Sequence, residues 1–283
     1  MTEKEEEASN RPVVLVTGCG KGGIGFEYCK HFAQMGCDVY ASDVGSVENM
    51  QELTAQNARI KTLCMDVTSD ESVAAGVEEV VREAGRIDVV VNNAGVGATG
   101  PLAELPLAEV QRAWEINCLG HLRVVQTVVP HMVRRGHGTI VNVGSVVGAV
   151  STPWAGAYCA SKAALHAASE ALRLELRPFG IRVVLVMPGA IRSNFGEANL
   201  QRLRERKWGL YAPFKEAILG RAVASQGANS TCPSAFASHI VAKVLMPRPP
   251  RRIVFGRMAG LLGILSVAPL WLRDLYFSRR FGL

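Results

Sequence analysis

The sequence predicts an α/β fold in which a single domain is built on a doubly wound parallel sheet. The chain has 283 residues and is 48% hydrophobic, which is enough for one large domain with a full core. Six short apolar runs alternate with segments of helical periodicity, and strands that alternate with helices pair in parallel. A glycine-rich segment directly after the first apolar run is the third observation.

The apolar runs are short and rich in β-branched residues, as the strands of a buried parallel sheet are. We expect helices to follow them, with Ser69 or Asp70 as one N-cap and Gly36 as one C-cap. The strands are expected at residues 13–16, 38–43, 59–65, 87–91, 138–143 and 181–186. The helices are expected at residues 26–35, 69–84 and 107–130, and around Tyr158 up to residue 177.

The glycine-rich segment, residues 17–25, joins the first strand to the first helix. Glycines let the backbone approach a pyrophosphate, and a helix N-terminus supplies N–H groups and a positive dipole. Strand, glycine turn and helix are the context that a Rossmann-like dinucleotide motif requires, which disfavours the alternative of a merely flexible turn. The expected cofactor-binding residues of the turn are Thr17, Gly18, Lys21, Gly23, Ile24 and Gly25.

Asp43 ends the second strand and bears on the choice of dinucleotide. A carboxylate at this point can bind the adenosine ribose hydroxyls and would repel a 2′-phosphate, so Asp43 favours NAD. Lys21 in the glycine turn points the other way, because an ammonium there could reach a 2′-phosphate. NADP therefore stays open, as does the alternative that Asp43 is an ordinary turn residue.

Several other strands end in polar residues or glycines. Because ligands of doubly wound sheets bind beyond the carboxyl ends of the strands, these residues are expected to meet at one edge. They are Asp66 and Val67 after the third strand, Asn93, Ala94 and Gly95 after the fourth, Ser145 after the fifth, and Pro188 and Gly189 after the sixth.

Tyr158 and Lys162 lie four positions apart, so a helix places them on one face. A phenol has a free pKa of about 10, and a nearby ammonium would lower that pKa by favouring the phenolate. The pair could then act as a general acid and base. Two solvated neighbours on a helix surface are the alternative that the spacing alone would favour.

These motifs together resemble those of the short-chain dehydrogenase/reductase family over residues 12–193. The resemblance rests on the glycine turn, on Asn92-Asn93-Ala94-Gly95, and on Pro188-Gly189 with Ser193. The turn has four residues between Thr17-Gly18 and Gly23-Ile24-Gly25, where the family commonly has three, and Ser193 replaces the commoner Thr. Within the family, the turn and the basic, apolar C-terminal region look most similar to the 1-acyldihydroxyacetone-phosphate reductase branch.

The resemblance implies a catalytic tetrad of Asn117, Ser145, Tyr158 and Lys162. It implies hydride transfer between a nicotinamide cofactor and a carbonyl or secondary alcohol, with Tyr158 passing the proton. Lys162 would lower the pKa of Tyr158 and hold the nicotinamide ribose. Ser145 would orient the substrate oxygen, and Asn117 would hold a water of a proton relay. Cofactor contacts are also implied for Tyr158, Lys162, Ile191 and Ser193.

The composition disfavours several other functions. The net charge of +6 comes from the C-terminal region, where residues 248–280 hold seven arginines against one aspartate, and no nucleic-acid-binding module is evident. The seven cysteines show neither CxxC spacing nor an even number, and the six histidines show no metal-binding spacing. We expect no metal site and a reducing, cytoplasmic location. The acidic N-terminus has no apolar signal segment.

The C-terminal third is expected to complete the substrate site. We divide the chain into a disordered lead (residues 1–11), the dinucleotide-binding domain (12–250) with a helical lid (195–234), and a basic, apolar tail (251–283). In the lid, Trp208, Leu210, Tyr211, Phe214 and Leu219 either line a lipid-like pocket or pack the lid onto the domain. The sequence does not choose between these two roles.

Residues 258–272 contain no charged residue, but these 15 positions are fewer than the about 20 needed to span a bilayer. Arginines flank them, so residues 257–277 could form an in-plane anchor on a membrane or lipid droplet, such as the cytosolic face of the endoplasmic reticulum. The alternative is a helix that packs on the domain or on a second subunit.

An oxidoreductase acting on a lipid-like ketone is the leading functional prediction. A steroid or retinoid dehydrogenase is the first alternative. A dinucleotide-binding regulator without catalysis is the alternative from another class, although the intact tetrad disfavours it. A small-molecule, apolar substrate and a homo-oligomer are expected, whereas the direction of the reaction and the number of subunits are left open.

Overall fold

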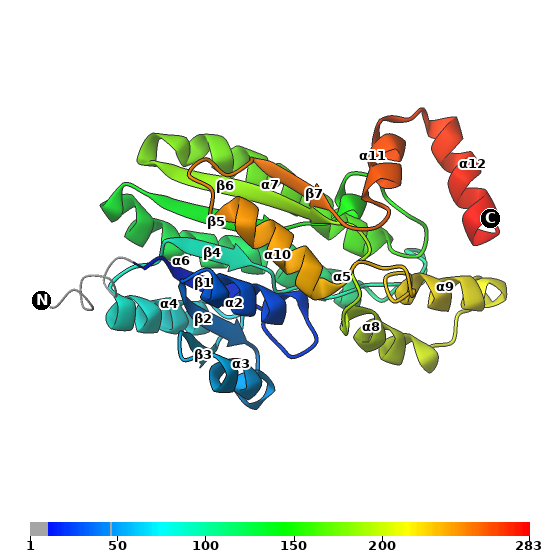
Figure 1. The fold of residues 1–283 in the computed structure, drawn as a ribbon. Helices are drawn as coiled ribbons and strands as arrows, with labels where there is room; N and C mark the ends of the chain where they lie inside the picture. Colours follow the sequence, from blue (N-terminus) through cyan, green and yellow to red (C-terminus); the bar gives the residue numbers. More distant parts are fainter. Residues whose placement is uncertain (1–10, 46) are drawn as a thin grey trace, which may run out of the picture.

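A computed structural model describes residues 11–45 and 47–283. At its centre is a seven-stranded sheet in the order β3-β2-β1-β4-β5-β6-β7, in which all neighbouring strands are parallel (Figure 1). The doubly wound α/β fold predicted from the sequence is therefore confirmed. The strands are β1 (Val13–Thr17), β2 (Asp38–Asp43), β3 (Ile60–Cys64), β4 (Val89–Asn92), β5 (Gly138–Val143), β6 (Ile181–Pro188) and β7 (Arg252–Phe255).

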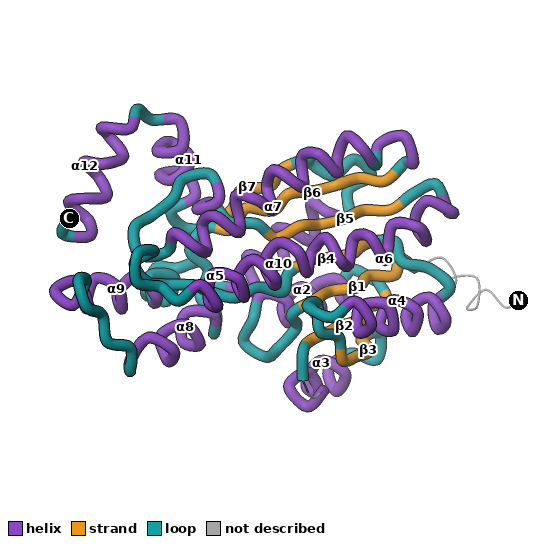
Figure 2. The backbone as a smooth tube through the Cα atoms, turned by 180° about the vertical axis from the view of Figure 1, so that it is seen from behind, coloured by secondary structure: helices purple, strands orange, loops and turns teal. Residues whose placement is uncertain are grey.

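Helices cover both faces of the sheet, because successive strand residues point to opposite sides and both sets are apolar. In β1, for example, Val14 belongs to one core cluster and Leu15 to the other. One face is covered by α2 (Ile24–Gln34), α3 (Gln51–Gln56) and α10 (Pro233–Val244). The opposite face, seen in Figure 2, is covered by α4 (Asp70–Ala84), α6 (Gly120–Arg135) and α7 (Gly156–Glu175).

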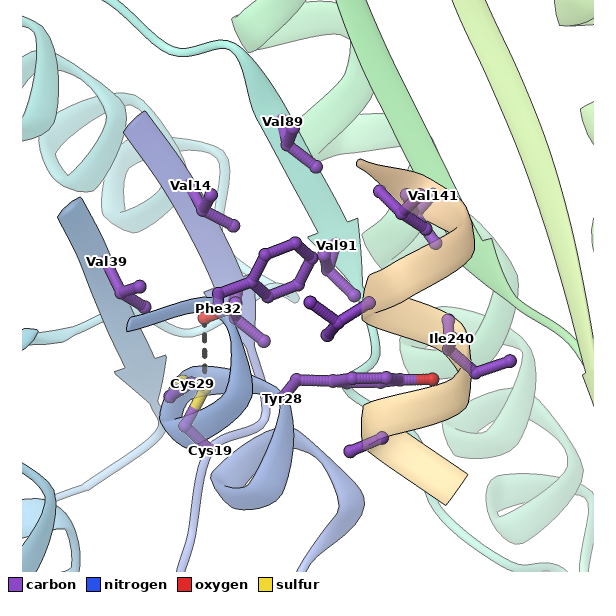
Figure 3. Close-up of a cluster of buried hydrophobic side chains, with 14 of the residues drawn as sticks. Val14, Cys19, Tyr28, Cys29, Phe32, Val39, Val89, Val91, Val141 and Ile240 are labelled. Atoms are coloured by element: carbon purple, nitrogen blue, oxygen red, sulfur yellow. Dashed lines mark hydrogen bonds between the residues drawn. The ribbon is translucent and has the colours of Figure 1, made fainter. Parts of the chain in front are cut away.

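The helix that begins at the glycine turn is held firmly by the first of these core clusters. Figure 3 shows Tyr28 and Phe32 of α2 between the valines of the sheet and α10, which carries Ile240. The ring of Tyr28 lies 6.2 Å from that of Phe236, and both residues are fully buried. Because α2 is wedged between sheet and helix, its N-terminal N–H groups have a fixed position beside the glycine turn.

The seventh strand, β7, was not predicted. It pairs with β6, with Leu185 opposite Arg252 and Pro188 opposite Phe255. Only Ile253 of its four residues is fully buried, since β7 forms an edge of the sheet and has a neighbour on one side. A short edge strand that follows prolines and arginines lacks the continuous apolar run by which the six inner strands were recognised.

The prediction of one regular helix at residues 107–130 is wrong. The structure has α5 (Leu107–Trp114), a π-helical turn, η2 (Glu115–Leu119), and then α6, which continues to Arg135. Asn117 therefore lies in the π-helical turn and not in the middle of an α-helix. Apolar periodicity cannot reveal such a turn, because one inserted residue only shifts the phase of the pattern.

Four helices gather beyond the carboxyl ends of the strands: α8 (Phe195–Arg204), α9 (Lys215–Ala222), α11 (Ala259–Val267) and α12 (Leu270–Phe281) (Figure 1). The apolar segment of the tail is thus two helices that meet at Ala268 and Pro269. Among the described residues, no helix combines the length and the apolar character needed to cross a membrane.

The division of the chain into lead, domain, lid and tail stays a prediction. Residues 1–10 of the predicted disordered lead fall outside the described part of the chain. The lid segment does contain α8 and α9, and β7 joins residues of the predicted tail to the sheet.

Candidate active site

A cavity of about 760 Å³ opens beyond the carboxyl ends of the strands. It runs from the glycine turn, past Asp43 and the end of β4, to Tyr158 and the loop after β6. A volume of this size is within the range of cofactor and ligand sites, which is about 300–1,000 Å³. The predicted strand-end residues that line it are Gly18, Gly23, Ile24, Asp43, Asp66, Val67, Asn93, Ala94, Gly95, Ser145, Pro188, Gly189, Ile191 and Ser193.

The glycine turn is tight enough that two of its glycines have no room for a side chain. A Cβ on Gly25 would lie 2.2 Å from the carbonyl oxygen of Gly18, and a Cβ on Gly18 would lie 2.7 Å from the Cα of Ala94. Gly18 also has a φ of 71°, which favours glycine. The backbone at the start of α2 is thus open to the cavity, and it fits the pyrophosphate of a dinucleotide.

Thr17 and Asn93 fasten the glycine turn to the end of β4. The Oγ1 of Thr17 accepts hydrogen bonds from the backbone N–H groups of Asn93 and Ala94, both at 3.0 Å. The Nδ2 of Asn93 donates to the carbonyl oxygens of Thr17 and Gly18, both at 2.9 Å. Thr17 itself does not reach the cavity, so its part is to position the turn.

Asp43 projects from the end of β2 toward the glycine turn. Its carboxylate accepts hydrogen bonds from the backbone N–H of Gly20 and, at 2.7 Å, from that of Val44. Burial raises the pKa of Asp43, and the two backbone hydrogen bonds act against that rise. The carboxylate lines the cavity where the adenosine end of a dinucleotide would lie.

Lys21 is not brought into the cavity by the structure. Its Nζ lies 2.7 Å from Oε2 of Glu52, and the side chain is largely exposed. Of the two residues with opposite implications for the cofactor, Asp43 is therefore the one that faces the binding space.

The loop after β6 is tied to the glycine turn by Asn194, a residue that the sequence analysis missed. The Nδ2 of Asn194 donates to the carbonyl oxygen of Lys21 at 2.8 Å, and its backbone N–H donates to that of Gly22 at 3.2 Å. Asn194 directly follows the motif residue Ser193, and this position in the sequence could have indicated that it belongs to the site.

Tyr158 lies in the cavity on α7, and its electrostatics differ from the expectation. Burial raises the pKa of Tyr158 to about 12, and the Ser145 hydroxyl offsets only part of that rise. Burial, and not the predicted lowering by Lys162, is therefore the main influence on the pKa of Tyr158. A phenol with this pKa is protonated at neutral pH.

Lys162 is buried one turn further along α7, with 3% of its surface exposed. Its Nζ donates to the carbonyl oxygen of Val143 at 2.7 Å and lies 6.0 Å from the ring centroid of Tyr158. Burial lowers the pKa of Lys162 to about 7. The ammonium therefore stands beneath the phenol ring, beside the end of β5, and its charge titrates near neutral pH.

Ser145 is positioned by His166, which the sequence analysis had not linked to the site. The backbone N–H of Ser145 donates to Nε2 of His166 at 3.3 Å. Burial lowers the pKa of His166 to about 4, so the imidazole is neutral at physiological pH. The ring fills the space beside Gly144 and Gly148, where added Cβ atoms would lie 2.4 and 2.6 Å from it.

Asn117 holds the chain that follows β4. Its Oδ1 accepts from the backbone N–H of Val96 at 2.8 Å, and its Nδ2 donates to Val96 O at 2.9 Å and to Ser161 Oγ at 3.0 Å. A Cβ on Gly95 would lie 3.2 Å from Asn117 Oδ1 and 3.7 Å from Lys162 Nζ, so these two polar atoms flank one glycine. The side chain thus connects β4, η2 and α7.

The apolar lid residues pack on the domain, which is the second of the two roles considered for them. Trp154 lies 5.6 Å from Tyr211 and 5.5 Å from Phe214, measured between ring centroids. Trp208 belongs to the same core cluster, whereas Leu210 is exposed. The cavity is lined instead by other residues of this region: Phe195, Asn199, Ala217, Gly220, Arg221, Ala222, Ala224 and Ser225.

The tail also contributes to the cavity, which the sequence did not suggest. Its lining residues are Met258, Leu262, Tyr276, Phe277, Arg280 and Phe281. Leu262 and Phe277 pack on Val146 and Val147, directly after Ser145. Within the described residues, no three His, Cys, Asp or Glu side chains come together as a metal site would require.

Comparison with known proteins gives a consistent result. A family model described as short chain dehydrogenase matches residues 12–203. Short-chain dehydrogenase ptmH of Penicillium ochrochloron is 33% identical over 96% of this chain and 99% of its own length. An NADPH-dependent 1-acyldihydroxyacetone phosphate reductase of Schizosaccharomyces pombe is 37% identical over 73% of this chain and 70% of its own. The crystal structure of NAD⁺-bound xylitol dehydrogenase superposes with a TM-score of 0.70, at 28% identity, over 83% of this chain and 92% of the other.

We predict that Asn117→Ala lowers the free energy of unfolding as well as activity. The substitution removes three hydrogen bonds, two of them to the half-buried backbone of Val96, and a hydrogen bond contributes about 0.5–1.5 kcal/mol. We expect a loss of about 2–4 kcal/mol in urea unfolding, summed over these groups. Asn229→Ala, in an exposed turn, is the control and should change little. Activity lost at unchanged stability would contradict this positioning role.

Proposed function

This chain belongs to the short-chain dehydrogenase family, and on that basis we propose that it reduces the ketone of a lipid-like substrate at Tyr158. Membership makes it an oxidoreductase that uses NAD or NADP, which sets aside the non-catalytic regulator. The observation that carries the proposal is that one cavity is lined by the glycine turn and by Ser145, Tyr158 and Lys162. Asn117 does not line it but hydrogen-bonds Val96, which does.

The residues of the cavity fit a dinucleotide along its whole length. The glycine turn and the start of α2 would hold the pyrophosphate, Asp43 the adenosine ribose, and Pro188, Gly189, Ile191 and Ser193 the nicotinamide side. When bound in its reduced form, the cofactor supplies the hydride. The roles of these residues are part of the proposal.

The proton would come from Tyr158. With a pKa of about 12 the phenol is protonated at neutral pH, so it can donate to the oxygen of a carbonyl as that carbon is reduced. Ser145 would hydrogen-bond the same oxygen and orient it. Lys162, with a pKa of about 7, would replenish the proton after the phenol has donated its own. Asn117 would support that relay from the far side of Gly95.

Two features support an apolar, lipid-like substrate. The end of the cavity beyond Tyr158 is formed by Leu262, Phe277 and Phe281 of the tail, together with Val146 and Val147. The Schizosaccharomyces pombe relative is named for an acylated substrate. A substrate similar to acyl-dihydroxyacetone phosphate therefore fits better than a small polar ketone, and it is preferred over a steroid or a retinoid.

NAD is proposed as the preferred cofactor because Asp43 faces the cavity and Lys21 is engaged by Glu52. The 2′-phosphate of NADP would come close to the Asp43 carboxylate, where like charges repel. The name of the Schizosaccharomyces pombe relative points to NADPH for that protein, so the two observations favour different cofactors.

The outer face of the tail is proposed to rest on a membrane or lipid-droplet surface. Val267 and Leu270 are 84% and 70% exposed, and Ile264 and Trp271 are also exposed beside them. Such apolar side chains next to arginines are typical of helices that lie in an anionic interface. The cytosolic face of the endoplasmic reticulum would then be the site of action.

Tyr158→Phe is expected to remove nearly all turnover, because it deletes the proton donor and little else. General acid catalysis contributes roughly 10²–10⁴-fold, and the loss in kcat should reach at least the lower figure. Binding of the reduced cofactor, followed by nicotinamide fluorescence, should persist. Turnover within about tenfold of the unaltered chain would refute the role, since it is below the range for a lost acid catalyst.

Asp43→Asn should shift the cofactor preference toward NADPH. The amide keeps one acceptor oxygen for the glycine turn and removes the charge, so the ratio of kcat/KM for NADH over NADPH should fall by about tenfold. Lys21→Gln serves as the comparison and should leave this ratio unchanged. A fall in NADPH use with Lys21→Gln alone would mean that Lys21, and not Asp43, governs the choice.

Membrane binding is best tested on the full chain with substitutions on the exposed face. Val267→Asp combined with Leu270→Asp should weaken co-sedimentation with phosphatidylcholine–phosphatidylserine vesicles by roughly tenfold or more, because burying each apolar side chain contributes about 1.5–3 kcal/mol. Leu107→Asp alters an equally exposed leucine on α5 and should have no effect. Equal sedimentation of all three proteins would exclude this surface.

A further inference from the structure

Two arginines enter the substrate end of the cavity from helices outside the sheet. Arg221 lies on α9 and Arg280 lies on α12, and both line the cavity. Neither residue is part of the glycine turn, the tetrad or the loop after β6. The cofactor chemistry proposed above therefore assigns no role to these two positive charges.

The guanidinium of Arg221 has a neutral partner and no acidic one among the described side chains. Its Nε donates to Oγ1 of Thr152 at 3.0 Å, and Thr152 is itself buried. The ion pairs of the described residues include neither Arg221 nor Arg280. Arg206 on the same side of the molecule, by contrast, is paired with Glu109.

The two guanidinium groups also repel one another. Burial lowers the pKa of Arg221, the neighbouring Cys159 and Tyr158 act against that, and the charge of Arg280 lowers it again. Arg221 is half-buried and has no carboxylate partner among the described side chains, so an anion in the cavity would offset its charge; Arg280 is exposed and adds a second positive charge to the cavity lining. The positive charges of these two residues therefore favour the binding of a negatively charged group in the cavity.

The position of Arg221 relative to the phenol locates that group on the substrate. The Oγ1 of Thr152, which accepts from Arg221, lies 4.0 Å from Sγ of Cys159, the residue after Tyr158, and Arg221 and Tyr158 line the same cavity. An anion held by Arg221 would therefore lie near the carbonyl that receives the proton of Tyr158.

We propose that Arg221 and Arg280 form an anion subsite that binds a phosphate monoester on the ketone substrate. A phosphate monoester carries about −1.5 to −2 charges at neutral pH, which matches two guanidinium groups, whereas a carboxylate carries one. Guanidinium groups bind phosphate through paired hydrogen bonds. This inference rests on the proposed function and makes Arg221 the residue that determines specificity within it.

The first test compares two ketones that differ only in the phosphate, dihydroxyacetone phosphate and dihydroxyacetone. The unaltered chain should show a higher kcat/KM for the phosphorylated ketone. Arg221→Gln should lower that value by roughly 10- to 150-fold, the effect of losing a hydrogen bond to a charged group, and should lower the value for dihydroxyacetone far less. Arg280→Gln should act in the same direction, and Arg221→Lys should restore part of the preference.

Lys215→Gln is the matched control, because Lys215 begins the same helix and does not line the cavity. It should leave both ketones unaffected. An equal loss for both ketones with Arg221→Gln would overturn the proposal, since Arg221 would then act on Tyr158 or on folding. So would equal use of both ketones by the unaltered chain. Thermal unfolding of each variant shows whether the fold persists.

A binding measurement separates this inference from the proposed function. Octyl phosphate is titrated calorimetrically into the full chain with saturating NAD⁺, which occupies the other phosphate-binding positions. Its Kd should rise about tenfold or more in Arg221→Gln and Arg280→Gln, even if neither ketone is reduced. Unchanged affinity in both variants would exclude the subsite. Octanoate that binds as tightly as octyl phosphate would overturn the assignment to phosphate.

Discussion

All strands of the sheet point the same way, and the placement of the strand-end residues in the cavity follows from this constraint. The carboxyl ends of seven parallel strands share one edge, so residues far apart in the sequence meet there. The contact of the glycine turn with the end of β4 sets the first part of the cavity. Gly18 approaches Ala94 so closely that neither strand end can shift without the other.

The same parallel arrangement accounts for the buried charge of the site. Lys162 reaches the carbonyl oxygen of Val143 because β5 ends beside the second turn of α7. With this one described hydrogen-bond partner and almost no contact with solvent, the ammonium easily loses its charge. A protonated phenol and a readily deprotonated ammonium, side by side, suit a site that delivers a proton and then recovers one.

Much of the fold could be predicted from the sequence, and the reason is physical. Inner strands such as β1 and β5 are buried on both faces and are therefore largely apolar. Glycine is required where two backbone segments lie too close together to leave room for a Cβ atom. The edge strand β7 and the π-helical turn at Asn117 produce no comparable pattern in the sequence. The first is only half buried, and the second changes the geometry of a helix without changing its composition.

Lining residues of the cavity were predicted where motif residues stand at strand ends, and they were missed where position depends on tertiary packing. His166 reaches Ser145 because two glycines make room for its ring, and Arg221 reaches Thr152 and the cavity because α9 lies beyond the end of the sheet. Neither relation can be read from spacing along the chain. The aromatic lid residues, which composition suggested for the pocket, are held by Trp154 instead.

Helix α12 has two faces with different surroundings. Phe277 packs inward next to the loop of Ser145, and Trp271 and Leu270 stand on the outside. A chain shortened before residue 257 would consequently lose the tail residues that line the cavity, together with the exposed apolar side chains of the tail. Shortened forms made for easier purification would then be altered enzymes, in which a weak activity says nothing about where the intact protein resides.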